Sequence, residues 1–196
     1  KAMTPFAPMP VDSALNAIGN TPVVRLRRVV PPDHADVYVK LEYFNPTGSY
    51  KDRMALAMIE QAESRGSLEP GMTVVEYTGG STGSSLAFVC AVKGIRFHAV
   101  STDAIAQEKL RTMKALGAEL DIVRSVNGNI SADLIPRMIE RANELGANDG
   151  YFMTDQFNNR DSLLGYRKIG EELLEQFPDG VSAFCAGVGT GGMLMG

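Results

Sequence analysis

Short apolar runs with the composition of strands alternate along this chain with longer segments whose apolar residues recur at helical spacing. This alternation predicts parallel strands joined by crossover helices, because parallel strands need long connections. The sequence therefore predicts an α/β fold with mostly parallel sheets. The expected strands are residues 37–43, 73–77, 97–100, 120–123, 151–154 and 181–186, and the expected helices are residues 54–62, 86–92, 110–116, 134–145 and 163–177, with a further helix opening at Met193.

Composition indicates an ordinary globular protein, with 44% hydrophobic and 21% charged residues over 196 positions. A formal net charge of −4 argues against nucleic acid or an anionic membrane surface as a partner. No apolar run approaches the roughly 20 residues that cross a bilayer. Residues 1–10 lack the basic patch and apolar stretch of a secretory signal. We therefore expect a cytoplasmic protein with no membrane partner.

The two cysteines, Cys90 and Cys185, lie far apart and within apolar runs. Such cysteines usually behave as small buried hydrophobic residues. We therefore expect both to be buried, with no disulfide and no metal site.

Three turns combine glycine with hydroxyl side chains between a strand and a helix. They are residues 45–52 (NPTGSYKD), 78–83 (TGGSTG) and 187–192 (GVGTGG). In an open parallel sheet such turns lie at the carboxyl ends of strands, where ligands bind. Glycine lets the backbone approach an anion, and the helix start supplies free N–H donors. Although glycines can simply make tight turns, three such turns predict a ligand with more than one anionic group.

Two of these turns also fit motifs of other enzyme classes. Residues 187–192 satisfy the G-x-G-x-x-G fingerprint of dinucleotide-binding proteins, but the acidic residue about 20 positions later cannot be checked. Residues 79–83 satisfy the G-x-S-x-G nucleophile elbow of α/β-hydrolases. A hydrolase needs an acidic residue and then a histidine after Ser81, and no acidic residue lies between Ser81 and His98. The hydrolase interpretation therefore depends on residues beyond 196.

Lys51 follows Ser49 at the predicted start of a helix. The helix dipole at this end favours anions, so the ammonium form is destabilised. A neutral amine is the form that Schiff-base chemistry requires. We expect Lys40 and Arg53 to point elsewhere. A solvent-exposed lysine without a special role is the alternative.

A series of longer motifs carries a family resemblance. The motifs are residues 18–26 (IGNTPVVRL), 40–53 (KLEYFNPTGSYKDR), 76–83 (EYTGGSTG), 117–119 (GAE), 155–158 (DQFN) and 187–192 (GVGTGG). In order and spacing this series resembles the cysteine synthase family, part of the β-family of pyridoxal 5'-phosphate (PLP) enzymes that includes cystathionine β-synthase, serine racemase and threonine dehydratase.

The resemblance implies a role for each matching residue. Lys51 would hold PLP as a Schiff base and act as the acid and base at the substrate Cα. Ser81 replaces an asparagine that faces the cofactor's ring oxygen in the family. The cofactor phosphate would be bound by Gly189, Thr190, Gly191 and Gly192, and the substrate carboxylate by Thr78, Gly79, Gly80, Ser81 and Thr82, with Gln156 as a second donor.

Other positions depart from the family pattern as well. Tyr77 stands in place of the usual proline, Met193 in place of a threonine, and Gly165 in place of a histidine. These changes leave the predicted fold and cofactor intact. They put the identity of the substrate in doubt.

The resemblance implies a two-lobed fold of the tryptophan synthase β type. The smaller lobe would span residues 38–144, and the larger lobe residues 1–37 and 145–196; the larger one is expected to be incomplete, because the chain stops at a turn that should feed a helix. The implied reaction is β-replacement on an O-activated serine, with sulfide giving cysteine or an analogue, in a homodimer. The alternatives are β-elimination or racemisation, and a non-catalytic PLP-binding relative.

Overall fold

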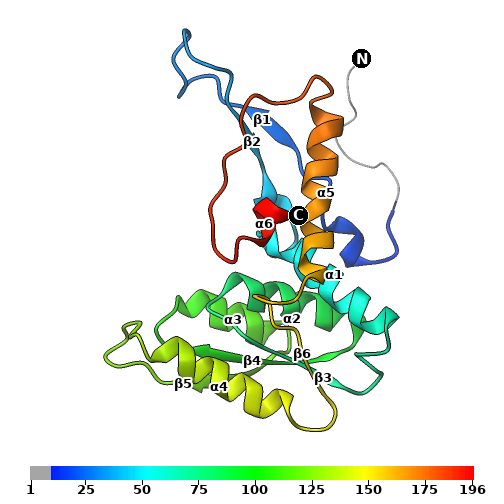
Figure 1. Ribbon diagram of the computed structural model, residues 1–196, viewed down its shortest axis with the longest axis vertical. Coiled ribbons are helices and arrows are strands. Elements are labelled where there is room, and N and C mark those ends of the chain that lie inside the picture. Colours follow the sequence, from blue (N-terminus) through cyan, green and yellow to red (C-terminus); the bar gives the residue numbers. More distant parts are fainter. Residues whose placement is uncertain (1–9) are drawn as a thin grey trace.

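The computed structural model describes residues 10–196, and its helices and strands form two parts that meet at helix α1 (Figure 1). Residues 1–9 lie outside the described residues. They include most of the segment inspected for a secretory signal, and they form the start of the predicted larger lobe. No helix within residues 10–196 is both long enough and apolar enough to cross a membrane.

The first part is a four-stranded parallel sheet with strand order β5-β4-β3-β6. Every residue of the central strand β3 is buried, as expected for a strand covered on both faces. The predicted strands at residues 73–77, 97–100, 120–123 and 151–154 are all confirmed, to within a few residues at their ends. The strands are β3 (Thr73–Tyr77), β4 (Arg96–Thr102), β5 (Glu119–Val123) and β6 (Tyr151–Met153).

Helices cover both faces of this sheet (Figure 1). Side chains alternate between the two faces along a strand, so Val74 packs with α1, α2 and α3, whereas Val75 and Tyr77 pack with α4. The predicted helices are confirmed, and Pro136 is accommodated because it lies in the first turn of its helix. These helices are α1 (Lys51–Ser64), α2 (Ser81–Lys93), α3 (Gln107–Ala115) and α4 (Leu134–Gly146).

The second part contains the antiparallel pair β1 (Val23–Arg25) and β2 (Tyr38–Lys40) and the helices α5 (Asp161–Gln176) and α6 (Gly192–Met195). The 3₁₀ helices η1 (Ala14–Ala17) and η2 (Glu42–Phe44) flank these strands. Helix α5 lies against α1 at Gly165, where an added Cβ would come within 2.2 Å of the Arg53 carbonyl oxygen. A side chain at Gly165 would therefore force the two helices apart.

Two predicted strands need correction. The strand expected over residues 37–43 ends at Lys40, because the chain turns into η2 before Asn45 and Pro46. The strand expected over residues 181–186 is not formed, since no strand among the described residues lies beside it to pair with its backbone. As a result Cys185 is exposed, and its predicted burial is wrong, whereas Cys90 is buried as expected.

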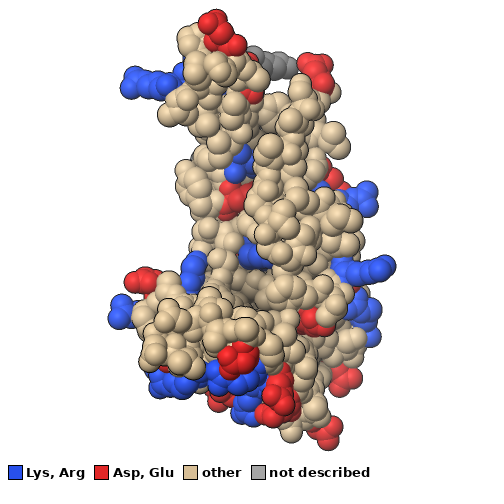
Figure 2. Space-filling model, turned by 60° about the vertical axis from the view of Figure 1, so that its left-hand side comes forward, with Lys and Arg blue, Asp and Glu red and all other residues tan. Residues whose placement is uncertain are grey.

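Charged side chains of both signs are interspersed on the face seen in Figure 2. They are most frequent at the end formed by the sheet and its helices. This face of the described residues therefore carries no broad positive patch of the kind that binds nucleic acid.

Candidate active site

Lys51 is the first residue of α1, as predicted, and its amine points into the protein. Its Nζ donates a hydrogen bond to the hydroxyl oxygen of Tyr166 at 3.0 Å and lies 3.8 Å from the Met54 sulfur. The same nitrogen lies 5.2 Å from the centre of the Tyr50 ring and 5.6 Å from that of Tyr166. The interpretation of Lys51 as a solvent-exposed lysine is therefore wrong.

Burial lowers the pKa of the Lys51 ammonium, and the negative charge of Glu76 opposes this shift. The sequence argument rested on the helix dipole, whereas the main cause in the structure is desolvation. Both causes lower the pKa of Lys51. An amine held in partly apolar surroundings is easier to deprotonate, as reaction with an aldehyde requires.

The turn at residues 78–83 is held together by the Thr78 side chain. Its hydroxyl oxygen accepts hydrogen bonds from the backbone N–H groups of Gly80 at 3.1 Å and Gly83 at 3.0 Å. Gly80 has a φ of 154°, which other residues rarely adopt. A Cβ at Gly83 would come within 2.3 Å of the Met113 sulfur. Both glycines are therefore required for this turn to close and for α2 to pack.

The structure brings together Thr82 and Gln156, two of the predicted substrate-binding residues. The Thr82 hydroxyl donates to the Gln156 side-chain oxygen at 2.7 Å. The Gln156 amide nitrogen in turn donates to the Tyr77 carbonyl oxygen at 3.1 Å. Gln156 therefore has a fixed orientation beside the turn that contains Thr82.

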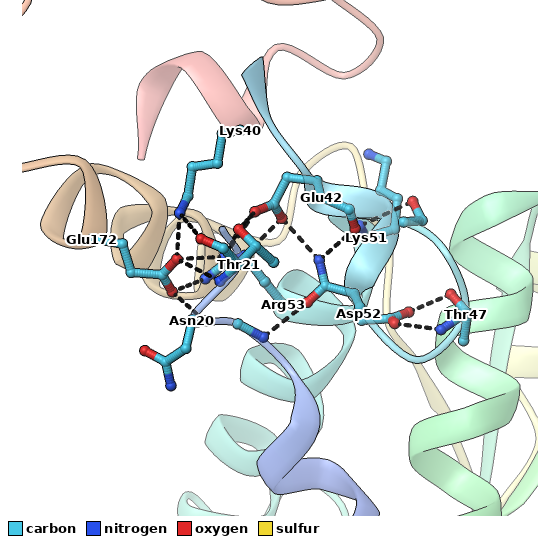
Figure 3. A network of polar contacts seen from close by, with 12 residues as sticks. Asn20, Thr21, Lys40, Glu42, Thr47, Lys51, Asp52, Arg53 and Glu172 are labelled. Carbon is cyan, nitrogen blue, oxygen red and sulfur yellow. Dashed lines mark hydrogen bonds and ion pairs between the residues drawn. The ribbon is translucent and has the colours of Figure 1, made fainter. Parts of the chain in front are cut away.

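The turn that precedes Lys51 is joined to α2. The Asp52 carboxylate accepts hydrogen bonds from the backbone N–H and the hydroxyl of Thr47, as Figure 3 shows. The Thr47 hydroxyl lies 3.3 Å from that of Ser85 on α2. The first predicted turn is thereby joined to the helix that follows the second one.

The third turn, residues 187–192, lies beside Tyr166. An added Cβ at Gly192 would be 3.0 Å from the Tyr166 ring, and the Tyr166 hydroxyl is the group that contacts Lys51. Lys51 and the last glycine of this turn therefore contact the same aromatic side chain. The sequence predicts no role for Tyr166, because no local pattern signals a contact between residues 115 positions apart.

Buried charges fix the start of α1 (Figure 3). The Arg53 guanidinium forms two hydrogen bonds with the carboxylate of Glu42, at 2.8 Å each, and two with that of Glu172, at 2.6 and 2.9 Å. The Lys40 amine pairs with Glu172 at 2.7 Å. Lys40 and Arg53 thus point away from Lys51, as expected.

Burial acts against ionisation of Glu172, but hydrogen bonds from Arg53 and Lys40 together outweigh it and lower its pKa to about 2. The same guanidinium lowers the pKa of Glu42 against the effect of burial. Both carboxylates are therefore charged at neutral pH, as a buried arginine with two-pronged geometry requires.

Residues 14–196 match the family described as "Pyridoxal-phosphate dependent enzyme". The chain belongs to this family. The predicted fold class and the resemblance to cysteine synthases are thereby confirmed. The match also removes the hydrolase and dinucleotide-binding interpretations of the glycine turns.

Curated relatives of this PLP family member include cysteine synthases. The chain is 47% identical to the cysteine synthase of Staphylococcus aureus (strain N315) over 193 residues, which cover 97% of the chain and 60% of that protein. It is 41% identical to cysteine synthase B of Salmonella typhimurium (strain LT2) over 181 residues, which cover 91% of the chain and 57% of that protein. The chain thus spans about 60% of the length of the curated relatives it matches.

Solved structures of family members superpose closely on this chain. A crystal structure of cysteine synthase from Entamoeba histolytica has a TM-score of 0.89 at 32% identity and covers 100% of this chain and 58% of its own. A crystal structure of O-ureido-L-serine synthase has a TM-score of 0.86 at 38% identity, covering 95% and 57%. A hydrogen sulfide-producing enzyme from Fusobacterium nucleatum has a TM-score of 0.85 at 34% identity, covering 94% and 59%.

PLP is the cofactor of this family, and the residues present fit it. The cofactor needs an amine for its aldehyde and N–H donors for its phosphate. Lys51 supplies a partly buried amine of lowered pKa. The backbone N–H groups of residues 188–191 make no hydrogen bond within residues 10–196 and remain free to donate. No described atom lies within 4 Å of an added Cβ at Gly189, which leaves space beside this backbone.

Proposed function

We propose that the whole protein catalyses PLP-dependent β-replacement on an O-activated serine, with sulfide or a related nucleophile forming cysteine or an analogue. The observation that carries this proposal is the position of the Lys51 amine, which contacts the same tyrosine as the turn at residues 187–192. The names of the curated relatives and of the superposed structures support the same reaction class.

PLP, when bound, supplies the electron sink that stabilises negative charge at the substrate Cα. In this proposal Lys51 holds the cofactor through Nζ and moves the Cα proton at the same atom. The cofactor phosphate is bound by Gly189, Thr190, Gly191 and Gly192, and Ser81 faces the cofactor ring.

The substrate carboxylate is bound beside α2. Gln156 donates to this carboxylate through the second hydrogen of its amide nitrogen, because the first hydrogen is donated to the Tyr77 carbonyl oxygen. The turn that supplies the remaining donors consists of Thr78, Gly79, Gly80, Ser81 and Thr82.

The experiment that tests this proposal mixes the whole protein with PLP, O-acetylserine and sulfide. We expect a visible absorbance band from bound cofactor and formation of cysteine. Lys51→Ala should lose both. Lys93→Ala is the matched control, because Lys93 pairs with Glu63 at the surface, away from this site. A band that persists unchanged in Lys51→Ala would contradict the assignment of the lysine.

β-Elimination is the second candidate, because one superposed structure is a hydrogen sulfide-producing enzyme. Product analysis separates the candidates: replacement gives a new amino acid only when a nucleophile is added, elimination gives a keto acid and ammonia without one, and racemisation changes only the configuration at Cα. Cofactor binding without turnover of any of these substrates would indicate a non-catalytic relative.

A homodimer and a cytoplasmic location complete the proposal. Both rest on the similarity to cysteine synthases. Light scattering of the whole protein at several concentrations tests the first, and cell fractionation the second.

A further inference from the structure

Glu76 is a carboxyl group that the proposed chemistry leaves without a role, yet it is completely buried. It is the fourth residue of β3, and its neighbours Val75 and Tyr77 pack towards α4. Side chains alternate along a strand, so Glu76 points to the opposite face, where α1 and α2 lie. This is the face that carries Lys51 and the turn at residues 78–83.

One oxygen of Glu76 organises the segment after β6. Its Oε2 accepts hydrogen bonds from the Thr154 hydroxyl at 2.7 Å and from the backbone N–H of Gln156 at 2.9 Å. Its Oε1 is enclosed and has no hydrogen bond to any of residues 10–196. Burial of a carboxyl costs free energy unless hydrogen bonds offset the loss of water, and here only one of the two oxygens is hydrogen-bonded.

The Glu76 carboxyl holds the backbone of Gln156 in place through one of these hydrogen bonds. With its backbone fixed by Glu76, its side chain reaches the Thr82 hydroxyl at 2.7 Å and the Tyr77 carbonyl at 3.1 Å. We propose that Glu76 is a positioning residue that holds Gln156 and, through it, the turn at residues 78–83 in the geometry that accepts a substrate carboxylate. This inference rests on the proposed function for the identity of the substrate, but not for the geometry.

Glu76 also acts on Lys51 through its charge. The charged or titratable groups that interact with its carboxyl are Lys51 on α1, Asp155 after β6 and the neighbouring phenol of Tyr77. Burial raises the pKa of Glu76 to about 7, although hydrogen bonds from Thr154 and Gln156 favour the carboxylate. Above that pH its negative charge supports the Lys51 ammonium. Glu76 therefore has two separable effects: hydrogen bonding to the turn and charge at the lysine.

Two variants separate these effects in the whole protein without cofactor. Glu76→Gln removes the charge and weakens both hydrogen bonds while keeping the shape. Thr154→Val removes one of the two hydrogen bonds but keeps the carboxyl group, which is ionised at pH values well above 7, where the amine is titrated. For each variant, hydrogen exchange measures the order of residues 78–83. The pH dependence of Lys51 acetylation by acetic anhydride, followed by mass spectrometry, measures the titration of the amine.

We expect faster exchange at residues 78–83 in both variants, and a Lys51 profile that moves to lower pH only in Glu76→Gln. With active enzyme, KM for O-acetylserine should rise about tenfold in both, the size of a lost hydrogen bond to a charged group, with a smaller change in kcat.

Unchanged exchange at residues 78–83 in variants that retain the native circular dichroism spectrum would overturn the inference. If Glu76→Gln does not fold, the exchange and KM of Thr154→Val decide alone. If no β-replacement is found, the proposed function fails, and the exchange measurement on the cofactor-free protein still decides the role of Glu76.

Discussion

The Lys51 amine and the Tyr166 hydroxyl lie 3.0 Å apart, although 115 positions separate the two residues in the sequence. Tyr166 accepts from the amine and donates to the sulfur of Met54 at 2.7 Å. Its ring is almost completely buried, with 1% of the side chain exposed. Helix α5 thus supplies both a buried aromatic ring and a polar contact to the Lys51 amine.

Tyr166→Phe should shift the titration of Lys51 to lower pH. The hydroxyl accepts from the amine, a contact that favours the ammonium form, and phenylalanine cannot accept. Acetylation of Lys51 at a series of pH values measures the shift. Tyr50→Phe is the control, since the Tyr50 ring also lies near Nζ but its hydroxyl makes no hydrogen bond among the described residues. An equal shift in both variants would contradict this account.

Gly165→Ala should destabilise the protein by about 1–3 kcal/mol, because its Cβ would meet backbone atoms of Arg53 that cannot rotate away. Gly170→Ala lies on the same helix with no atom within 4 Å of the added Cβ, and should stabilise by about 0.5–1 kcal/mol. Urea unfolding of both variants measures the contrast. Equal effects would show that α5 does not need to approach α1 so closely.

Arg53→Met should destabilise the protein by about 2–4 kcal/mol, since it leaves the partly buried carboxylates of Glu42 and Glu172 without their main partner. Arg65→Met removes a pair with Asp161 whose arginine side chain is 49% exposed, and should cost less than about 1 kcal/mol. The free energy of unfolding at neutral pH is the measurement. A small effect at Arg53 would mean that the two carboxylates find other partners.

The lowered pKa of Glu172 predicts that the free energy of unfolding falls at acidic pH. Its pKa is about 2 in the folded protein and 4.5 when unperturbed. A carboxyl whose pKa is lowered by folding stabilises the folded state at pH values above its pKa in the unfolded chain. This contribution is lost as the pH falls from about 4.5 towards 2. Glu172 is only partly buried, so solvent screening reduces this contribution to roughly 1–2 kcal/mol. Urea unfolding across this range should show the loss in wild type and a flatter dependence in Glu172→Gln.

The sequence was sufficient for the strands of the parallel sheet and for the helices between them. β3 was predicted with its observed bounds, because a run of this length, rich in β-branched residues and bounded by glycine-containing turns, favours a buried strand over a helix. The start of α1 at Lys51 and the contact of Thr82 with Gln156 also agree with the predictions.

Features that depend on tertiary partners could not be predicted in this way. Residues 181–186 have strand-like composition, but a strand forms only beside a neighbour that satisfies its backbone. The roles of Tyr166 and Glu76 depend on contacts with residues distant in sequence. Composition and periodicity do not report such contacts.

The pairing of Arg53 with Glu42 and Glu172 has a consequence for how the protein folds. Its members come from η2, α1 and α5, and one of these bonds joins residues 119 positions apart. Contacts of such long range form late, because the intervening chain must first lose its freedom. The amine two residues before Arg53 should therefore acquire its final environment only near the end of folding, so aldehyde reactivity of Lys51 during refolding would report completion of the native state.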